Sequence, residues 1–313
     1  MKVEDIKRVA VVGAGIMGRG ISQVCAQAGY QVMMTSRREE TLNGALDNIE
    51  SNLETLIRNQ VVTEEQAKAT LSRVKCTLNL GEAVRDADYV IEAVKEDKDL
   101  KKKLFQDFDE QCPQQTVLAT NTSSLSVTEL ASATRREDKF IGMHWWNPAY
   151  LMPLVEIVKG AKTSEETVEV TKAFAYVLRK VPVVCRDSPG FIGVRLHGAL
   201  IVEAISILEQ GLASAEDIDT TIKMTLGYRF PVIGPLETVD IGGLDTFLNV
   251  YDYLHRTLGD RFRPPDLLRQ NVKEGRLGLK TGKGFHEYTV RSAQALVDRR
   301  DEWILRRLRE SKR

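Results

Sequence analysis

The stretch that decides the fold of this chain is Arg8-Val9-Ala10-Val11-Val12-Gly13-Ala14-Gly15-Ile16-Met17-Gly18, in which three glycines join a strand pattern to a helix pattern. In such a strand, loop and helix, the first glycine permits a tight turn and the second lets the backbone approach a pyrophosphate. The third lets helix and strand pack closely. Free N–H groups at the helix start then favour an anion. The predicted dinucleotide-binding residues are Gly13, Gly15, Ile16, Met17 and Gly18.

Beyond this stretch, short β-branched runs alternate with longer amphipathic segments as far as Cys185, which predicts a Rossmann-like, doubly wound and mostly parallel sheet. The expected strands are 9–12, 32–35, 89–94, 117–120, 140–144, 154–158 and 183–185. From Pro189 onward the pattern is helical. The expected helices are 189–211, one from 214, 235–258, 266–274 and 292–313. We therefore expect an α/β domain over 1–187 and an all-α domain over 188–313.

The composition narrows the class of protein. The 313 residues include 44 Lys plus Arg and 44 Asp plus Glu, so the charges balance. A nucleic-acid-binding protein usually has an excess of basic residues, and we therefore expect no nucleic-acid partner. The first residues are acidic, which is not typical of a signal peptide, and no apolar segment is long enough for a membrane span. We therefore expect a cytoplasmic protein. The 4 cysteines form no CxxC pair, so we expect reduced thiols and no metal site.

The end of the second predicted strand bears on the choice of cofactor. An acidic residue usually holds the ribose 2′-hydroxyl of NAD at this place, but this chain has Ser36-Arg37-Arg38. Guanidinium groups suit a phosphate, so the sequence favours NADP over NAD. The alternative is that Arg37 and Arg38 are solvated loop charges beside Glu39 and Glu40.

A third group of polar residues follows the later strands, where open α/β sheets place their ligands. His144 ends one predicted strand and Glu156 lies in the next, so the carboxylate can fix the tautomer of the imidazole and prepare a general base. The alternative is a structural histidine. Trp145 and Trp146 either line a substrate pocket or pack beneath the histidine.

From about residue 8 to 288, the chain resembles the short-chain L-3-hydroxyacyl-CoA dehydrogenases, which include bacterial 3-hydroxybutyryl-CoA dehydrogenases. The segments that carry the resemblance are VVGAGIMGRG, NTSSLSVTELA, GMHWWNP, LVEIV, DSPGFIGVRL, GPLETVDIGGLD and LKTGKGFHEY. The resemblance implies reversible oxidation of a 3-hydroxyacyl thioester, with hydride passing to a nicotinamide. It implies that His144 takes the hydroxyl proton, that Glu156 orients His144, that Ser123 binds the reacting oxygen and that Asn147 places the substrate.

The resemblance also implies cofactor contacts by Glu96, Lys101 and Asn121, and a homodimer formed through the helical domain. The family usually reads PGFxxNR where this chain has Val194 in place of the asparagine. Segment 51–59, which faces CoA in relatives, offers only Arg58 to a phosphate.

These departures keep a second function open, a dehydrogenase of a free hydroxy acid of the L-gulonate or carnitine type. Segments 150–154 and 227–230 look closer to that branch, whereas 121–125 and 280–288 look closer to the acyl-CoA branch. A third alternative is a non-catalytic structural protein on the same fold. Retention of His144 and Glu156 argues against it.

Overall fold

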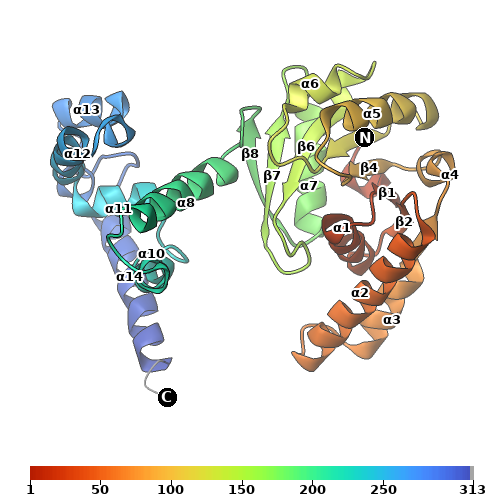
Figure 1. Ribbon diagram of the computed structural model, residues 1–313, viewed down its shortest axis with the longest axis horizontal. Coiled ribbons are helices and arrows are strands. Elements are labelled where there is room, and N and C mark those ends of the chain that lie inside the picture. The colour runs from red at the N-terminus through yellow and green to blue at the C-terminus, as the bar shows by residue number, and fades with distance from the viewer. Residues whose placement is uncertain (311–313) are drawn as a thin grey trace. The chain divides into compact units, whose positions relative to one another are not determined.

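The computed structural model describes residues 1–310 and contains two compact units, Met1–Ile201 and a second that begins at Val202 (Figure 1). Helix α8 (Gly193–Glu209) begins in the first unit and continues into the second. The domain boundary between residues 187 and 188 stays a prediction.

An eight-stranded sheet with the order β3-β2-β1-β4-β5-β6-β7-β8 forms the centre of the first unit. All neighbouring strands are parallel except β6 and β7, which are antiparallel. The predicted mostly parallel, doubly wound sheet is therefore confirmed. Its strands are β1 (Arg8–Val12), β2 (Gln31–Thr35), β3 (Val74–Thr77), β4 (Tyr89–Glu92), β5 (Val117–Thr120), β6 (Phe140–Trp145), β7 (Leu154–Lys159) and β8 (Val181–Arg186).

Helices cover both faces of this sheet, because side chains alternate along each strand. Val9 and Val11 of β1 belong to one hydrophobic cluster, and Ala10 and Val12 belong to another on the opposite face. Side chains of α1, α2, α3 and α7 complete the first cluster, and side chains of α4, α5 and α6 complete the second. These helices are α1 (Ile16–Gln27), α2 (Glu39–Arg58), α3 (Glu64–Arg73), α4 (Leu80–Val84), α5 (Lys98–Gln111), α6 (Val127–Ala131) and α7 (Glu165–Val177).

Strand β8 begins at Val181 rather than at residue 183, and two further strands differ from the sequence prediction for identifiable reasons. Strand β3 was not predicted, because it is an edge strand with a single buried residue, Val74, and no apolar run. Strand β4 ends at Glu92 rather than at residue 94, since the Val94 N–H turns back to donate to the Glu92 side chain, 2.7 Å away.

The second unit is helical. Beyond α8 it contains α9 (Ala215–Met224), α10 (Leu226–Arg229), α11 (Pro235–Gly242), α12 (Leu244–Leu258), α13 (Asp266–Lys273) and α14 (Val290–Glu310). The predicted helix over 235–258 is two helices, because Gly243 has φ +92° and interrupts it. The helix expected from Pro189 begins at Gly193, since Gly190 and Phe191 have left-handed backbones. Residues 311–313 of the predicted last helix lie outside the described residues.

A buried carboxylate organises the loop before α14. Asp240 is fully buried and accepts hydrogen bonds from the Phe285 N–H, the Tyr288 hydroxyl and two nitrogens of His286, all at 2.8–3.1 Å. A Cβ added at Gly284 would lie 2.0 Å from Asp240 Oδ1, so the glycine is required for this approach. None of the helices described in residues 1–310 has the length and apolar character that crossing a bilayer requires.

Candidate active site

The three glycines after β1 have three different surroundings. A Cβ on Gly13 would lie 2.5 Å from the Ala93 carbonyl oxygen, and one on Gly18 would lie 1.7 Å from the Gly13 oxygen. A Cβ on Gly15 would meet no atom within 4 Å. Gly13 and Gly18 therefore serve close packing, while Gly15 opens space in front of α1. Gly15 is also the N-cap of α1 and provides no side-chain cap, so this end of the helix fits the pyrophosphate of a dinucleotide.

A cavity of about 400 Å³ extends from this loop along the carboxyl ends of β1 and β2. Ser36, Arg37 and Arg38 line it. Neither guanidinium group makes a hydrogen bond or an ion pair with the described residues, so Glu39 and Glu40 do not neutralise them. The apolar wall of this cavity was not predicted, because its residues come from separate segments that no spacing rule connects. They are Leu78, Leu80, Leu100 and Leu104.

His144 and Glu156 face each other across the antiparallel pair of β6 and β7. The two residues are direct partners in the register, so both side chains point to the same face of the sheet. His144 Nδ1 lies 2.8 Å from Glu156 Oε2, and the side chains are 5% and 1% exposed. The structure thus brings the predicted imidazole and carboxylate into contact.

The second oxygen of Glu156 is bound by the start of the helical segment. Glu156 Oε1 accepts hydrogen bonds from the N–H groups of Ile192 and Gly193, at 3.0 and 2.9 Å. Burial acts to raise the pKa of Glu156, but the hydrogen bonds from His144 and the two amides outweigh it and lower that pKa. Glu156 is therefore ionised at neutral pH. The ionised carboxylate stabilises the folded state fully at pH values above the pKa of glutamate in the unfolded chain, which is about 4.3. This stabilisation is lost as the pH falls below that value.

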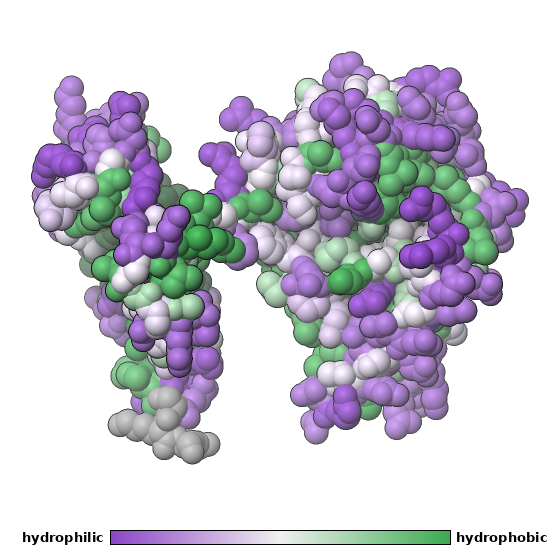
Figure 2. All heavy atoms as spheres, viewed as in Figure 1, coloured by the Kyte–Doolittle hydropathy of each residue, from purple (hydrophilic) through white to green (hydrophobic). Residues whose placement is uncertain are grey.

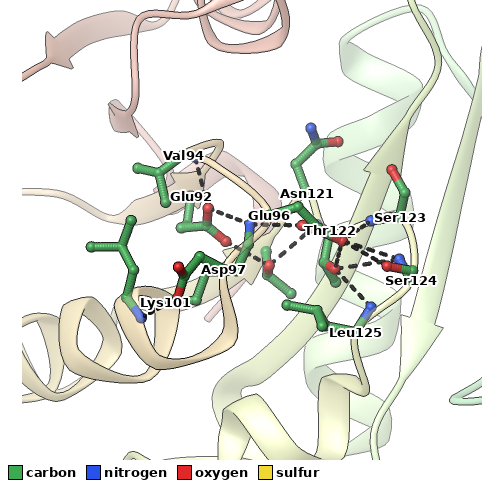
Figure 3. A network of polar contacts seen from close by, with 12 residues as sticks. Glu92, Val94, Glu96, Asp97, Lys101, Asn121, Thr122, Ser123, Ser124 and Leu125 are labelled. Atoms are coloured by element: carbon green, nitrogen blue, oxygen red, sulfur yellow. Dashed lines mark hydrogen bonds and ion pairs between the residues drawn. The ribbon is translucent and has the colours of Figure 1, made fainter.

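The segment that carries Ser123 is bound to Glu96 (Figure 3). Glu96 Oε1 accepts hydrogen bonds from the Thr122 hydroxyl, the Ser123 N–H, and the N–H and hydroxyl of Ser124. Burial raises the pKa of Glu96, yet the Thr122 hydrogen bond and the charge of Lys101 lower it overall. Ser123 is exposed, and its hydroxyl makes no hydrogen bond with the described residues.

Lys101 lies beneath this segment, in a buried ion pair. Its Nζ is 2.7 Å from Glu92 Oε1 and 3.2 Å from Glu96 Oε2, and its side chain is 1% exposed. Glu92 is fully buried and also accepts a hydrogen bond from the Thr120 hydroxyl at 2.7 Å. Glu92 was not predicted from the sequence, because it closes an apolar strand and nothing in the sequence marks Lys101, nine residues later, as buried.

The remaining predicted residues lie around the ends of β5 and β6. Asn121 is half-buried, and its Oδ1 accepts a hydrogen bond from the Trp145 N–H at 2.9 Å. Asn147 is exposed and lines a hollow with Ile16. Val194 is half-buried in the first turn of α8. Met17 packs against the hydrophobic core beside α1.

Two family models match consecutive parts of the chain. The 3-hydroxyacyl-CoA dehydrogenase NAD binding domain matches residues 8–188, and the 3-hydroxyacyl-CoA dehydrogenase C-terminal domain matches residues 190–288. The chain belongs to the 3-hydroxyacyl-CoA dehydrogenase family. The resemblance found in the sequence is thereby confirmed, and this family member is a dehydrogenase that uses a nicotinamide cofactor.

Individual members of the 3-hydroxyacyl-CoA dehydrogenase family match most of the chain. A probable 3-hydroxybutyryl-CoA dehydrogenase of Bacillus subtilis is 41% identical over 290 residues, which are 92% of this chain and 100% of the relative. The solved (S)-3-hydroxybutyryl-CoA dehydrogenase of Ralstonia eutropha is 38% identical, with a TM-score of 0.69 over 91% of this chain and 100% of that one. A solved 3-hydroxyacyl-CoA dehydrogenase of Archaeoglobus fulgidus is 35% identical, with a TM-score of 0.78 and coverage of 96% and 99%.

Proposed function

We propose that this chain oxidises a 3-hydroxyacyl-CoA, such as 3-hydroxybutyryl-CoA, reversibly to the 3-ketoacyl-CoA, with His144 as the general base. The observation that carries the proposal is the buried hydrogen bond between His144 and an ionised Glu156, within a family of 3-hydroxyacyl-CoA dehydrogenases. When bound, the nicotinamide accepts a hydride from the carbon that carries the hydroxyl group.

The chain's own residues handle the proton. Because His144 Nδ1 donates to Glu156, its Nε2 is the nitrogen that accepts the substrate hydroxyl proton. The carboxylate stabilises the imidazolium that forms, and the C–O bond becomes a carbonyl as the hydride leaves. We propose that the exposed Ser123 hydroxyl forms a hydrogen bond with the reacting oxygen of the substrate. We assign the placement of the substrate to Asn147. Lys101 is buried, so we assign it to the support of Glu96 and of the cofactor-facing segment at Asn121.

We further propose NADP as the preferred cofactor, because the two unpaired guanidinium groups and Ser36 line the cavity beside Gly15. The kcat/KM of the wild type is expected to be higher with NADP than with NAD. Ser36→Asp is expected to lower kcat/KM for NADP at least about tenfold, since a carboxylate repels the 2′-phosphate and hydrogen-bonds the NAD ribose. Arg85→Ala, which removes an exposed arginine outside the cavity, is the control. A clear NAD preference of the wild type would contradict the proposal.

The substrate is tested by assaying acetoacetyl-CoA, carnitine and L-gulonate side by side. We expect turnover with acetoacetyl-CoA. Val194→Asn is expected to raise the rate with this short acyl-CoA, because the amide restores a hydrogen-bond donor that valine lacks. An unchanged or lower rate would indicate that the valine suits another substrate.

A free hydroxy acid is the second candidate, and one observation favours it. The hollow of about 430 Å³ between α2 and α3 is lined by Glu50, Glu54 and Glu64 as well as by Arg58 and Lys68. Three carboxylates against two cations oppose the binding of CoA phosphates there. Turnover of carnitine or L-gulonate without turnover of acetoacetyl-CoA would favour this candidate.

We propose a cytoplasmic homodimer formed through the helical unit. None of the residues of α8 is buried, and apolar side chains gather over this helix (Figure 2). Its exposed apolar residues are Leu196, Leu200, Ile201, Val202, Ile205 and Leu208. An apolar surface of this kind is typical of an interface between subunits. The molar mass in solution measures the assembly directly.

A further inference from the structure

The indole of Trp146 rests on the backbone of Gly193, the first residue of α8. A Cβ added at Gly193 would lie 2.3 Å from Trp146 Cζ2 and 3.1 Å from Glu156 Oε2. Gly193 is helical and has no positive φ, so its backbone conformation does not require glycine. Gly193 therefore provides room for the Trp146 indole.

Trp146 also forms one side of the surroundings of His144. The ring centroids of Trp146 and Phe191 lie 5.5 and 5.7 Å from that of His144. Phe191 is buried, whereas Trp146 is half-buried. Glu156 occupies Nδ1, which leaves Nε2 for a substrate hydroxyl, and Trp146 is the more accessible of the two rings beside the imidazole.

We infer that Trp146, resting on Gly193, limits the size of the acyl substituent that the enzyme accepts. A hydroxyl group bound to Nε2 lies about 2.8 Å from it, so the alkyl chain on the same carbon meets the indole. Val194 follows Gly193 and is apolar, and the Nε1 of Trp146 is buried without a hydrogen-bond partner among the described residues. Short acyl chains are therefore preferred over longer ones, since each methylene in an apolar pocket changes specificity by about 10–200-fold. This inference rests on the proposed function.

The test compares Trp146→Leu with the wild type, using 3-ketoacyl-CoA substrates of four, six and eight carbons. Leucine removes the indole atoms that face Gly193, and the ratio of kcat/KM for eight carbons to that for four is expected to rise at least about tenfold. Trp146→Phe is the milder variant and is expected to shift the ratio in the same direction. Trp145→Leu is the matched control, because Trp145 lies in the hydrophobic cluster on the opposite face of β6 from His144. It is expected to leave the ratio unchanged.

Gly193→Ala tests the same contact by changing the glycine instead of the tryptophan. The added Cβ overlaps the indole, so kcat/KM for the four-carbon substrate is expected to fall in the wild-type background. The fall is expected to be several-fold smaller in the Trp146→Leu background, which removes the two indole atoms closest to the added Cβ.

The results that would overturn this inference differ from the result that would overturn the proposed function. A wild type that turns over the four-carbon substrate, together with an unchanged chain-length ratio in both Trp146 variants, overturns this inference alone. An equal loss at all chain lengths also overturns it, because Trp146 would then position His144 rather than limit size. A wild type inactive toward every 3-ketoacyl-CoA overturns the proposed function, and this inference with it.

Discussion

His144→Gln is expected to lower kcat by a factor of about 10²–10⁴, which is the usual contribution of a positioned general base. Glutamine keeps an N–H donor for Glu156, but its amide nitrogen is not basic and cannot take the hydroxyl proton. The cavity beside Gly15 is lined by the ends of β1 and β2, the residues after β4 and a wall of leucines, and His144 is not among its lining residues. The Kd of the cofactor is therefore expected to stay within a few-fold of the wild-type value. Steady-state rates and a cofactor titration measure the two effects.

His255→Gln is the control for the loss of an imidazole. His255 pairs with the exposed Asp260 in the second unit, so its removal is expected to leave kcat unchanged. If His144→Gln retains turnover, His144 is not the general base. A parallel loss of cofactor affinity would instead indicate a disturbed fold.

Lys101→Met is expected to lower the free energy of unfolding by about 3–5 kcal/mol, because it leaves the buried carboxylate of Glu92 without its cation. The Lys101 and Glu92 side chains are 1% and 0% exposed, so water cannot replace the lost partner. Lys102→Met is the control on the next residue. Lys102 pairs with Glu129 at 2.8 Å, but the side chains are 31% and 44% exposed, and the expected loss is below about 1 kcal/mol. Urea unfolding measures both variants.

The double variant Lys101→Met and Glu92→Gln distinguishes two causes of the lost stability, the unpaired buried charge and the lost packing of the lysine side chain. Glutamine keeps a side-chain oxygen for the Val94 N–H and carries no charge, so the double variant is expected to recover more than half of the loss. Equal unfolding midpoints for the two lysine variants would show that burial of the pair does not determine its contribution.

The sequence predicted the parts of the fold whose residues form local patterns. The β1 strand, the three glycines and the start of α1 are contiguous, and the close packing at Gly13 and Gly18 excludes a side chain at both positions. Strand β3 lacked such a pattern, because its position depends on pairing with β2 rather than on its own apolar residues. The break at Gly243 was likewise hidden in a continuous apolar spacing.

In the candidate site, too, some contacts could be predicted from the sequence and others could not. The contact of His144 with Glu156 could be anticipated, since the two strands are consecutive and joined by a short excursion. The amides of Ile192 and Gly193 on Glu156 could not, because they come from a distant segment. The family resemblance implied a cofactor contact for Lys101, whereas the structure buries its side chain between Glu92 and Glu96.

The antiparallel pairing of β6 with β7 has a consequence for the enzyme's tolerance of insertions and deletions. Because His144 and Glu156 are opposite partners in one ladder, adding or deleting one residue within either strand turns one of the two side chains to the other face. The connecting residues lie outside the ladder, but Trp146 and Asn147 among them have roles assigned above. An insertion or deletion is therefore expected to be tolerated only where it leaves both strands and these two residues in place.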